Sequence, residues 1–357
     1  MKNLIIAQKY LAPYRVNLFN LISENKNIEL SVIYYGKKEK RRVWKIFPNR
    51  LFKEINIKHL QINYGYEKSI TIPLFNLNPF FLKNKIVVCS TDFFAFYIYL
   101  FSHFVNFKYI IWTEMTYATE KNISYFKKIW RKILFKKAKA FIVPGLETLR
   151  YIKSYNVKSS IYFMKNSVDD EFQITKEEII KKFSDLSEIY LLFSGSLFNR
   201  KGVEILINSI KELNKLELKR KFKLIILGQG PLKIEKIENI DYMGFIEGKK
   251  YIDLFKNSHI FILPSYHDSN PLVTIEAIKS GNILVISKNV GNYPEVLRNN
   301  GKLIEPLDER TLTKILSDLI NESEESLLNM ALNSYEISQS FSHKKSAESF
   351  INIVKDI

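Results

Sequence analysis

LPSYHDSNPLVTIEA, at residues 263–277, is the most informative stretch of this chain. The apolar run His259–Leu263 predicts a buried strand, and Pro271–Lys279 predicts a helix after the turn. The first N–H groups of a helix have no partner within the helix, so they attract anions. Asp268 and Glu276 lie on either side of this turn, and carboxylates accept hydrogen bonds from hydroxyl groups. The turn therefore suits an anionic ligand with several hydroxyls, such as a sugar nucleotide, although an ordinary strand–turn–helix with Glu276 in solvent has the same pattern.

The composition predicts a protein with well-formed cores, since 46% of the 357 residues are hydrophobic and 25% are charged. The single cysteine, Cys89, excludes a disulfide framework and a cysteine-only metal site. The start, Met1–Ala7, is too short and too polar for a signal peptide and predicts a first strand. The longest apolar run, Phe93–Phe101, falls short of the roughly 18 residues of a membrane span. We therefore expect a cytoplasmic protein.

Short apolar segments alternate with segments of helical periodicity, which predicts two doubly wound α/β domains. In the first half we expect strands at 3–8, 29–34, 86–89, 108–112, 140–143 and 160–163. We expect helices there at 14–24, 92–104, 124–137 and 146–154. In the second half we expect strands at 189–194, 222–227, 240–243, 259–263 and 283–286. We expect helices there at 201–217, 248–257, 271–279, 308–320 and 324–339. The polar turn Asn166–Glu171 predicts a boundary between domains of residues 1–165 and 166–340, with 341–357 as a final helix.

The stretch 263–277 resembles the signature of the retaining glycosyltransferase family 4, Pro-Ser-x-x-Glu-Gly-Phe-Pro-Leu-x-x-x-Glu-Ala. Asp268 stands at the first Glu of that signature and Glu276 at the second, while Ser269-Asn270 replace Gly-Phe. The resemblance implies the GT-B fold, in which two Rossmann-like domains face each other across a cleft. It also implies that Asp268 binds hydroxyls of the donor sugar and that Glu276 holds the ribose.

Three other segments of the second half resemble donor-site elements of the same family. Residues 193–202, FSGSLFNRKG, resemble the Gly-Arg-Leu-x-x-x-Lys-Gly loop that holds the donor diphosphate, with Lys201 aligned and Ser196 in place of the Arg. Residues 224–231 match a strand followed by Gly-x-Gly-Pro, and residues 242–246 resemble an element that lies against the nucleobase. The implied donor-binding residues are Gly195, Ser196, Arg200, Gly228, Gly230, Gly244, Phe245, His267, Ser269, Asn270, Leu272 and Val273.

The catalytic candidates that the resemblance implies are Asp268, Glu276 and Lys201. Lys201 would neutralise the departing diphosphate, or it and Arg200 would simply be solvated cations at a helix start. Such cations oppose the helix macrodipole, so a bound anion would explain their position. The chain has no Asp-x-Asp metal motif, and no cofactor or metal is expected besides the nucleotide-sugar donor. Transfer with retention at the anomeric carbon would follow.

The first half contributes candidates for the acceptor side. Residues 8–20 resemble the Pro-Tyr-Arg-x-x-x-Phe-Asn start of one branch of the family, which points to Pro13, Tyr14 and Arg15. Arg15 would hold phosphate or sugar, or else be a solvated cation. Glu114, in a Trp-x-Glu element of the same branch, would contact the acceptor hydroxyl or else pair with a nearby Lys.

The net charge of +17 is confined to the first half: residues 1–165 hold 29 Lys and Arg against 9 Asp and Glu, and residues 166–357 hold 25 against 28. Cations and aromatic residues cluster in the loop Lys37–Lys45 and in the segment Tyr125–Lys139. The latter spaces Phe126, Ile129, Trp130 and Ile133 along one helical face. This is either an ordinary amphipathic helix packed on its domain or a contact with an anionic bilayer.

The sequence as a whole predicts transfer of a sugar from a UDP- or GDP-activated donor. The acceptor would be a glycan or a polyprenyl-diphosphate-linked glycan in bacterial surface polysaccharide synthesis, such as O-antigen or capsule, at the inner face of the membrane. A GT-B epimerase or hydrolase and a non-catalytic scaffold are alternatives. A nucleic-acid-binding protein is another, but the cations match no known nucleic-acid-binding motif, so no nucleic acid partner is expected.

Overall fold

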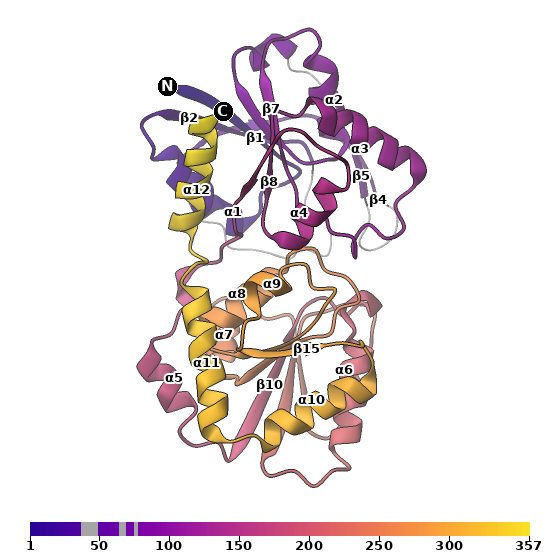
Figure 1. Cartoon of the computed structure of the whole chain (residues 1–357), viewed down its shortest axis with the longest axis vertical. Coiled ribbons are helices and arrows are strands. Elements are labelled where there is room, and N and C mark those ends of the chain that lie inside the picture. Colours follow the sequence, from indigo (N-terminus) through magenta and orange to yellow (C-terminus); the bar gives the residue numbers. More distant parts are fainter. Residues whose placement is uncertain (37–48, 64–68, 75–77) are drawn as a thin grey trace.

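The computed structural model describes residues 1–36, 49–63, 69–74 and 78–357, and it shows two α/β halves stacked end to end (Figure 1). Each half contains one parallel sheet, with strand order β3-β2-β1-β6-β7-β8-β9 in the N-terminal half and β12-β11-β10-β13-β14-β15 in the C-terminal half. Helices cover both faces of each sheet. This confirms the predicted fold class of two doubly wound domains. The cluster Lys37–Lys45 lies outside the described residues.

The N-terminal half is built from seven parallel strands and a separate hairpin. The strands of its sheet are β1 (Lys2–Gln8), β2 (Ile28–Tyr34), β3 (Lys53–Asn56), β6 (Ile86–Cys89), β7 (Lys108–Trp112), β8 (Ala140–Val143) and β9 (Ser160–Phe163). The antiparallel hairpin is β4 (His59–Asn63) with β5 (Ser69–Pro73). The helices are α1 (Pro13–Ser23), α2 (Phe93–Phe101), α3 (Tyr125–Lys137) and α4 (Leu146–Lys153), with a 3₁₀ turn η1 (Pro79–Leu82).

The C-terminal half has six parallel strands around one large core. They are β10 (Glu188–Ser194), β11 (Lys221–Leu227), β12 (Ile240–Gly244), β13 (Ile260–Leu263), β14 (Ile283–Ser287) and β15 (Gly301–Ile304). Its helices are α5 (Lys176–Lys182), α6 (Val203–Leu213), α7 (Lys249–Asn257), α8 (Leu272–Lys279), α9 (Tyr293–Val296), α10 (Glu309–Asn321) and α11 (Glu324–Ser338), with 3₁₀ turns η2 (Asp170–Phe172) and η3 (Asn199–Lys201). The central strand β13 is apolar throughout because helices bury both its faces.

The last helix, α12 (His343–Asp356), returns to the N-terminal half, where it packs on α1 (Figure 1). Its side chains Phe350 and Val354 are buried in the same cluster as Val16 and Phe19 of α1. The C-terminus therefore completes the core of the first sheet, and the chain passes between the halves twice.

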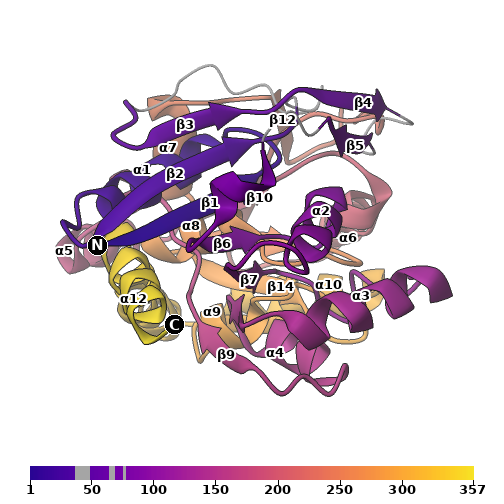
Figure 2. The ribbon, with the colours of Figure 1, turned by 90° about the horizontal axis from the view of Figure 1, so that it is seen from above.

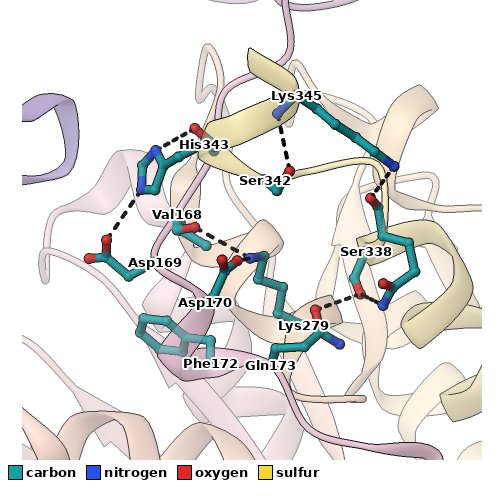
Figure 3. Close-up of polar contacts among 12 residues, drawn as sticks. Val168, Asp169, Asp170, Phe172, Gln173, Lys279, Ser338, Ser342, His343 and Lys345 are labelled. Atoms are coloured by element: carbon teal, nitrogen blue, oxygen red, sulfur yellow. Dashed lines mark hydrogen bonds and ion pairs between the residues drawn. The ribbon is translucent and has the colours of Figure 1, made fainter. Parts of the chain in front are cut away.

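The two crossings are tied together by polar contacts (Figure 3). Asp169, in the first crossing, accepts hydrogen bonds from Asn17 of α1 at 2.7 Å and from His343 of α12 at 3.2 Å. The His343 bond, followed by that from Asn17, holds the pKa of Asp169 below its ordinary value. The neighbouring Asp170 pairs with the buried Lys279 of α8 at 2.5 Å. The linker is thus anchored to both halves.

Two predicted helices are shorter than the sequence suggests. The segment 92–104 is helical only over α2, and the segment 201–217 divides into η3 and α6. Gly202 separates these two, because it adopts a left-handed φ of 69° and a Cβ there would lie 1.9 Å from the Pro264 carbonyl oxygen. The sequence analysis did not predict β3, the hairpin, α9, β15 or α5. The capping box formed by Thr175 and Glu178 is a sequence signal for the start of α5.

Within the described residues, no helix is both long and apolar enough to cross a bilayer.

Candidate active site

The carboxyl ends of the parallel strands in the two halves meet at the junction, which is where open α/β sheets bind ligands. A cavity of about 380 Å³ lies there. It is lined from the N-terminal half by Gln8, Arg15, Trp112 and Glu114 among others, and from the C-terminal half by Ser269. One donor-side candidate, Ser269, therefore faces the same cavity as the acceptor-side candidates Arg15 and Glu114.

Lys201 and Asp268 form an ion pair at the ends of β10 and β13. Their side chains are only 9% and 14% exposed, so the pair lies inside the protein. Lys201 is the last residue of the 3₁₀ turn η3, which ends at Gly202, and its side chain is buried. The alternative of a solvated cation at a helix start is therefore wrong for Lys201. Arg200 reaches back to Ser196, with Nη2 and Oγ 3.5 Å apart, so a guanidinium does lie near the position where the family has an Arg.

The position of Asp268 is set by a backbone bridge to the loop after β14. Its N–H donates to the Asn289 carbonyl at 3.1 Å, and its own carbonyl accepts from the Gly291 N–H at 2.8 Å. A Cβ at Gly291 would lie 2.0 Å from the Ser269 carbonyl oxygen, so only glycine allows this approach. The acidic turn is thus held in an extended conformation.

Glu276 lies in α8 and accepts a hydrogen bond from the Tyr251 hydroxyl of α7 at 2.8 Å. The Tyr251 oxygen lies 3.0 Å from Oγ of Ser194, at the end of β10. Burial raises the pKa of Glu276 from its ordinary value to about 7. The alternative of a solvated Glu276 is therefore wrong. The sequence missed Tyr251, because no motif relates a residue of α7 to one of α8.

The glycines in the loop after β11 allow the backbone of that loop to pack closely on the loop after β10. A Cβ at Gly228 would lie 1.8 Å from the Gly195 carbonyl oxygen, and one at Gly230 would lie 2.5 Å from the Leu197 carbonyl oxygen. These contacts bring the loop after β11 against the loop after β10. At the end of β12, Gly244 has a left-handed φ of 68° and the neighbouring Phe245 is 41% exposed. An exposed aromatic side chain at a strand end can stack on a base.

The remaining donor candidates surround the start of α8. Pro271 precedes the helix, which begins at Leu272 rather than at Pro271, with Val273 in its first turn. His267 is exposed and Ser269 half-buried. Asn270 is buried, and its Oδ1 accepts from Nδ2 of Asn166 at 3.2 Å and of Asn292 at 3.4 Å.

On the acceptor side, Arg15 lies in the first turn of α1, next to Pro13 and Tyr14. Its guanidinium donates to Glu114 at 2.9 Å and lies 4.1 Å from the centroid of the Trp112 ring. Its side chain is 13% exposed, so the alternative of a solvated cation is wrong. The partner of Glu114 is this Arg and not a Lys.

The side-chain amide of Asn166 links the acceptor-side candidates to the donor-side candidates. Glu114 also accepts from Nδ2 of Asn166, at 2.8 Å, and the same nitrogen donates to Asn270. The sequence marked Asn166 only as part of the linker. The structure therefore brings Arg15 and Glu114 into contact with the donor turn through one buried side chain. Among the described residues, no group of three or more His, Cys, Asp and Glu is arranged to hold a metal ion.

The fold and the position of the site define a protein of the GT-B type. The whole chain superposes on sucrose-phosphate synthase from Thermosynechococcus elongatus with a TM-score of 0.75 at 14% identity, covering 100% of this chain and 99% of the other. It superposes on Anabaena HepE in complex with UDP and glucose with a TM-score of 0.73 at 12% identity, covering 100% of both chains.

Residues 175–336, within the C-terminal half, match the family model of glycosyl transferases group 1. An uncharacterized glycosyltransferase of Methanocaldococcus jannaschii is 28% identical over 37% of this chain and 36% of its own length. An uncharacterized 41.2 kDa protein in the cps region of Klebsiella pneumoniae is 30% identical over 50% of this chain and 52% of its own length. The chain thus spans about a third and about half of these two relatives. A third relative, O-antigen chain mannosyltransferase B of Escherichia coli, is 24% identical over 41% of this chain and 40% of its own length.

Proposed function

We propose that this protein is a retaining glycosyltransferase that takes a sugar from a nucleotide-sugar donor. The observation that carries the proposal is the buried pair of Lys201 and Asp268 beside the start of α8, with Glu276 held in the same helix. These groups combine a cation, helix N–H donors and two carboxylates at the ends of neighbouring strands. Such a set matches a ligand with a diphosphate and two sugar rings, and the group 1 domain supports it.

Each group then has a chemical role. Lys201 and the first N–H groups of α8 bind the diphosphate and stabilise the charge that develops on it, without a metal ion. Asp268 accepts from hydroxyls of the transferred sugar, and Glu276 accepts from the ribose. The bond from the anomeric carbon to the diphosphate oxygen breaks as the acceptor hydroxyl oxygen bonds to that carbon on the same face. The hydroxyl proton leaves with the diphosphate.

The proposed donor is a UDP- or GDP-activated hexose, and UDP in the Anabaena neighbour supports the first. The proposed acceptor is a glycan or a polyprenyl-diphosphate-linked glycan of a bacterial surface polysaccharide, entering by the cavity beside Arg15 and Glu114. The E. coli relative named for O-antigen supports this setting. The protein would then work at the inner face of the cytoplasmic membrane.

Thermal unfolding in the presence of a panel of UDP-, GDP- and other activated sugars tests the donor. A ligand at 100 times its Kd adds about 2.7 kcal/mol to the free energy of unfolding, so the true donor raises Tm measurably. The configuration of the transferred sugar, read by NMR, tests retention. Conversion of the donor with no acceptor present would favour an epimerase or hydrolase instead, and absence of any response across the panel would contradict the proposal.

Replacing Lys201 by Gln keeps a donor for Asp268 but removes the positive charge. A hydrogen bond to a charged group contributes about 1.5–3 kcal/mol, so we expect transfer to fall roughly 10- to 150-fold. The matched control is Lys211→Gln, which removes an exposed cation from the last turn of α6 and should leave transfer unchanged. Equal activities of the two variants would contradict the role of Lys201.

A further inference from the structure

The outward face of α3 carries three large apolar side chains among its exposed lysines, although the helix also packs apolar side chains on the domain. Phe126 is 82% exposed, and Ile129 and Ile133 are 41% and 42% exposed. The side that packs on the domain instead contains Arg131 and Leu134, both buried. An ordinary surface helix turns its charged residues to water and its apolar residues to the core. In α3 three large apolar side chains on one stripe point away from the core.

The neighbouring helix α2 repeats this arrangement. Phe96 and Leu100 are exposed by 41% and 37%, and Phe104, just after the helix, by 82%. The two helices touch through Phe96 and Trp130, whose ring centroids are 5.3 Å apart, and they lie side by side at one edge of the N-terminal half (Figure 2). We call the exposed side chains of this pair the aromatic face; it consists of Phe96, Leu100, Phe104, Phe126, Ile129 and Ile133. Contiguous exposed apolar surface of this kind marks an interaction site.

The segments that form the aromatic face are rich in lysine and contain few acidic residues. The sequence contains no acidic residue between Asp92 and Glu114 or between Glu120 and Glu147. Four exposed lysines flank the stripe on α3, namely Lys127, Lys128, Lys132 and Lys136. A second copy of this chain would bring like charges together at this face, which is unfavourable. A surface that is apolar inside and anionic at its boundary complements it, and an anionic lipid bilayer has those properties.

We propose that the aromatic face docks this protein on an anionic bilayer, with the rings in the interface and the lysines at the headgroups. A cavity of about 670 Å³ adjoins the face, lined by Lys121 and Lys128 and, from the C-terminal half, by Lys288. It shares the lining residue Glu120 with the cavity beside Arg15, so the two cavities are neighbours. The docking deepens the proposed function, on which it rests, because it would bring the cleft close to a lipid-linked acceptor anchored in the same bilayer.

Co-sedimentation of the full-length protein with vesicles of phosphatidylglycerol and phosphatidylcholine tests the docking. We expect the wild type to bind at low salt, and less as salt rises. The double variant Phe104→Ser/Phe126→Ser should lower the vesicle partition coefficient by about tenfold or more, since burial of each ring contributes strongly to binding. The triple variant Lys128→Gln/Lys132→Gln/Lys136→Gln should abolish the preference for anionic over pure phosphatidylcholine vesicles.

The control changes two exposed apolar side chains in the C-terminal half, far from the aromatic face in the chain. Ile180 and Leu216 are 49% and 48% exposed, and Ile180→Ser/Leu216→Ser should leave vesicle binding unchanged. A wild type that stays in the supernatant overturns the docking, and so does a control that loses binding as much as the Phe variant. Self-association of the wild type that the Phe variant abolishes, without vesicle binding, would identify the face as a protein interface instead. Because the assay needs no turnover, docking and the proposed transferase activity can fail separately.

Discussion

Glu276 illustrates how one enclosed carboxylate sets the pH dependence of a site. Its ordinary pKa of 4.5 is raised to about 7 by burial, while the Tyr251 hydroxyl bond opposes the rise by stabilising the charged form. In the role proposed for Glu276, ribose hydroxyls are best bound by the ionised carboxylate, which accepts on both oxygens. Donor binding should therefore strengthen with pH across the neutral range.

We predict that the affinity for a nucleotide sugar rises by up to about tenfold between about pH 6 and pH 8, as Glu276 ionises. Glu276→Gln should abolish this dependence, and Tyr251→Phe should move its midpoint to higher pH. Isothermal titration at several pH values measures both. A pH dependence that persists in Glu276→Gln would assign the titration to another group.

The same shift makes a matching prediction for stability. The folded state holds the Glu276 proton more tightly than the unfolded chain, so this residue lowers the free energy of unfolding as the pH rises from about 4.5 to about 7. Urea unfolding of wild type and Glu276→Gln should therefore diverge over that interval. Equal curves would show that the carboxylate is less enclosed than the structure indicates.

At the scale of single elements, α3 shows why a helix can place a cation on its buried side. Arg131 donates through Nη1 to Glu120 at 2.8 Å and to the Tyr151 hydroxyl at 2.7 Å. This pairing offsets the cost of burying a guanidinium. The apolar stripe of α3 is left outside because the packed side is already filled by Arg131, Leu134 and Phe135.

Arg131→Gln should lower the free energy of unfolding by about 3–5 kcal/mol, since it leaves a largely buried carboxylate without its partner. The neighbouring Lys132→Gln changes an exposed residue of the same helix and should stay within about 0.5 kcal/mol of wild type. Urea denaturation distinguishes them. Similar small losses in both variants would mean that the Arg131 pair contributes little.

For the molecule as a whole, the contact between the halves depends on a few polar groups. Glu295 of α9 accepts from the backbone N–H of Leu146, at the start of α4 in the other half, at 2.8 Å. Burial raises the pKa of Glu295 above its ordinary value. Gly145 leaves room for this carboxylate, because a Cβ there would lie 2.5 Å from it. The contact spans the junction at which acceptor and donor meet in the proposed function.

Gly145→Ala should displace the Glu295 carboxylate and weaken closure of the two halves. We expect a larger radius of gyration by small-angle scattering and roughly tenfold slower transfer, because a charged hydrogen bond worth about 1.5–3 kcal/mol is lost. Donor affinity should change little, since the proposed donor residues belong to the C-terminal half. In a Glu295→Ala background the same substitution should have no further effect.

The sequence by itself determined the two parallel sheets, because strands buried on both faces must be continuous apolar runs and the helices between them must be amphipathic. It also marked Asp268 and Glu276, on either side of a helix start that suits an anion, and the resemblance to glycosyltransferase family 4 added Lys201. Only the tertiary structure decided which groups pair: Lys201 with Asp268, Arg15 with Glu114, and Tyr251 with Glu276. It alone also decided that α12 completes the first core and that Phe126, Ile129 and Ile133 of α3 face outward. Those outcomes depend on contacts between residues far apart in the chain, and no local periodicity encodes them.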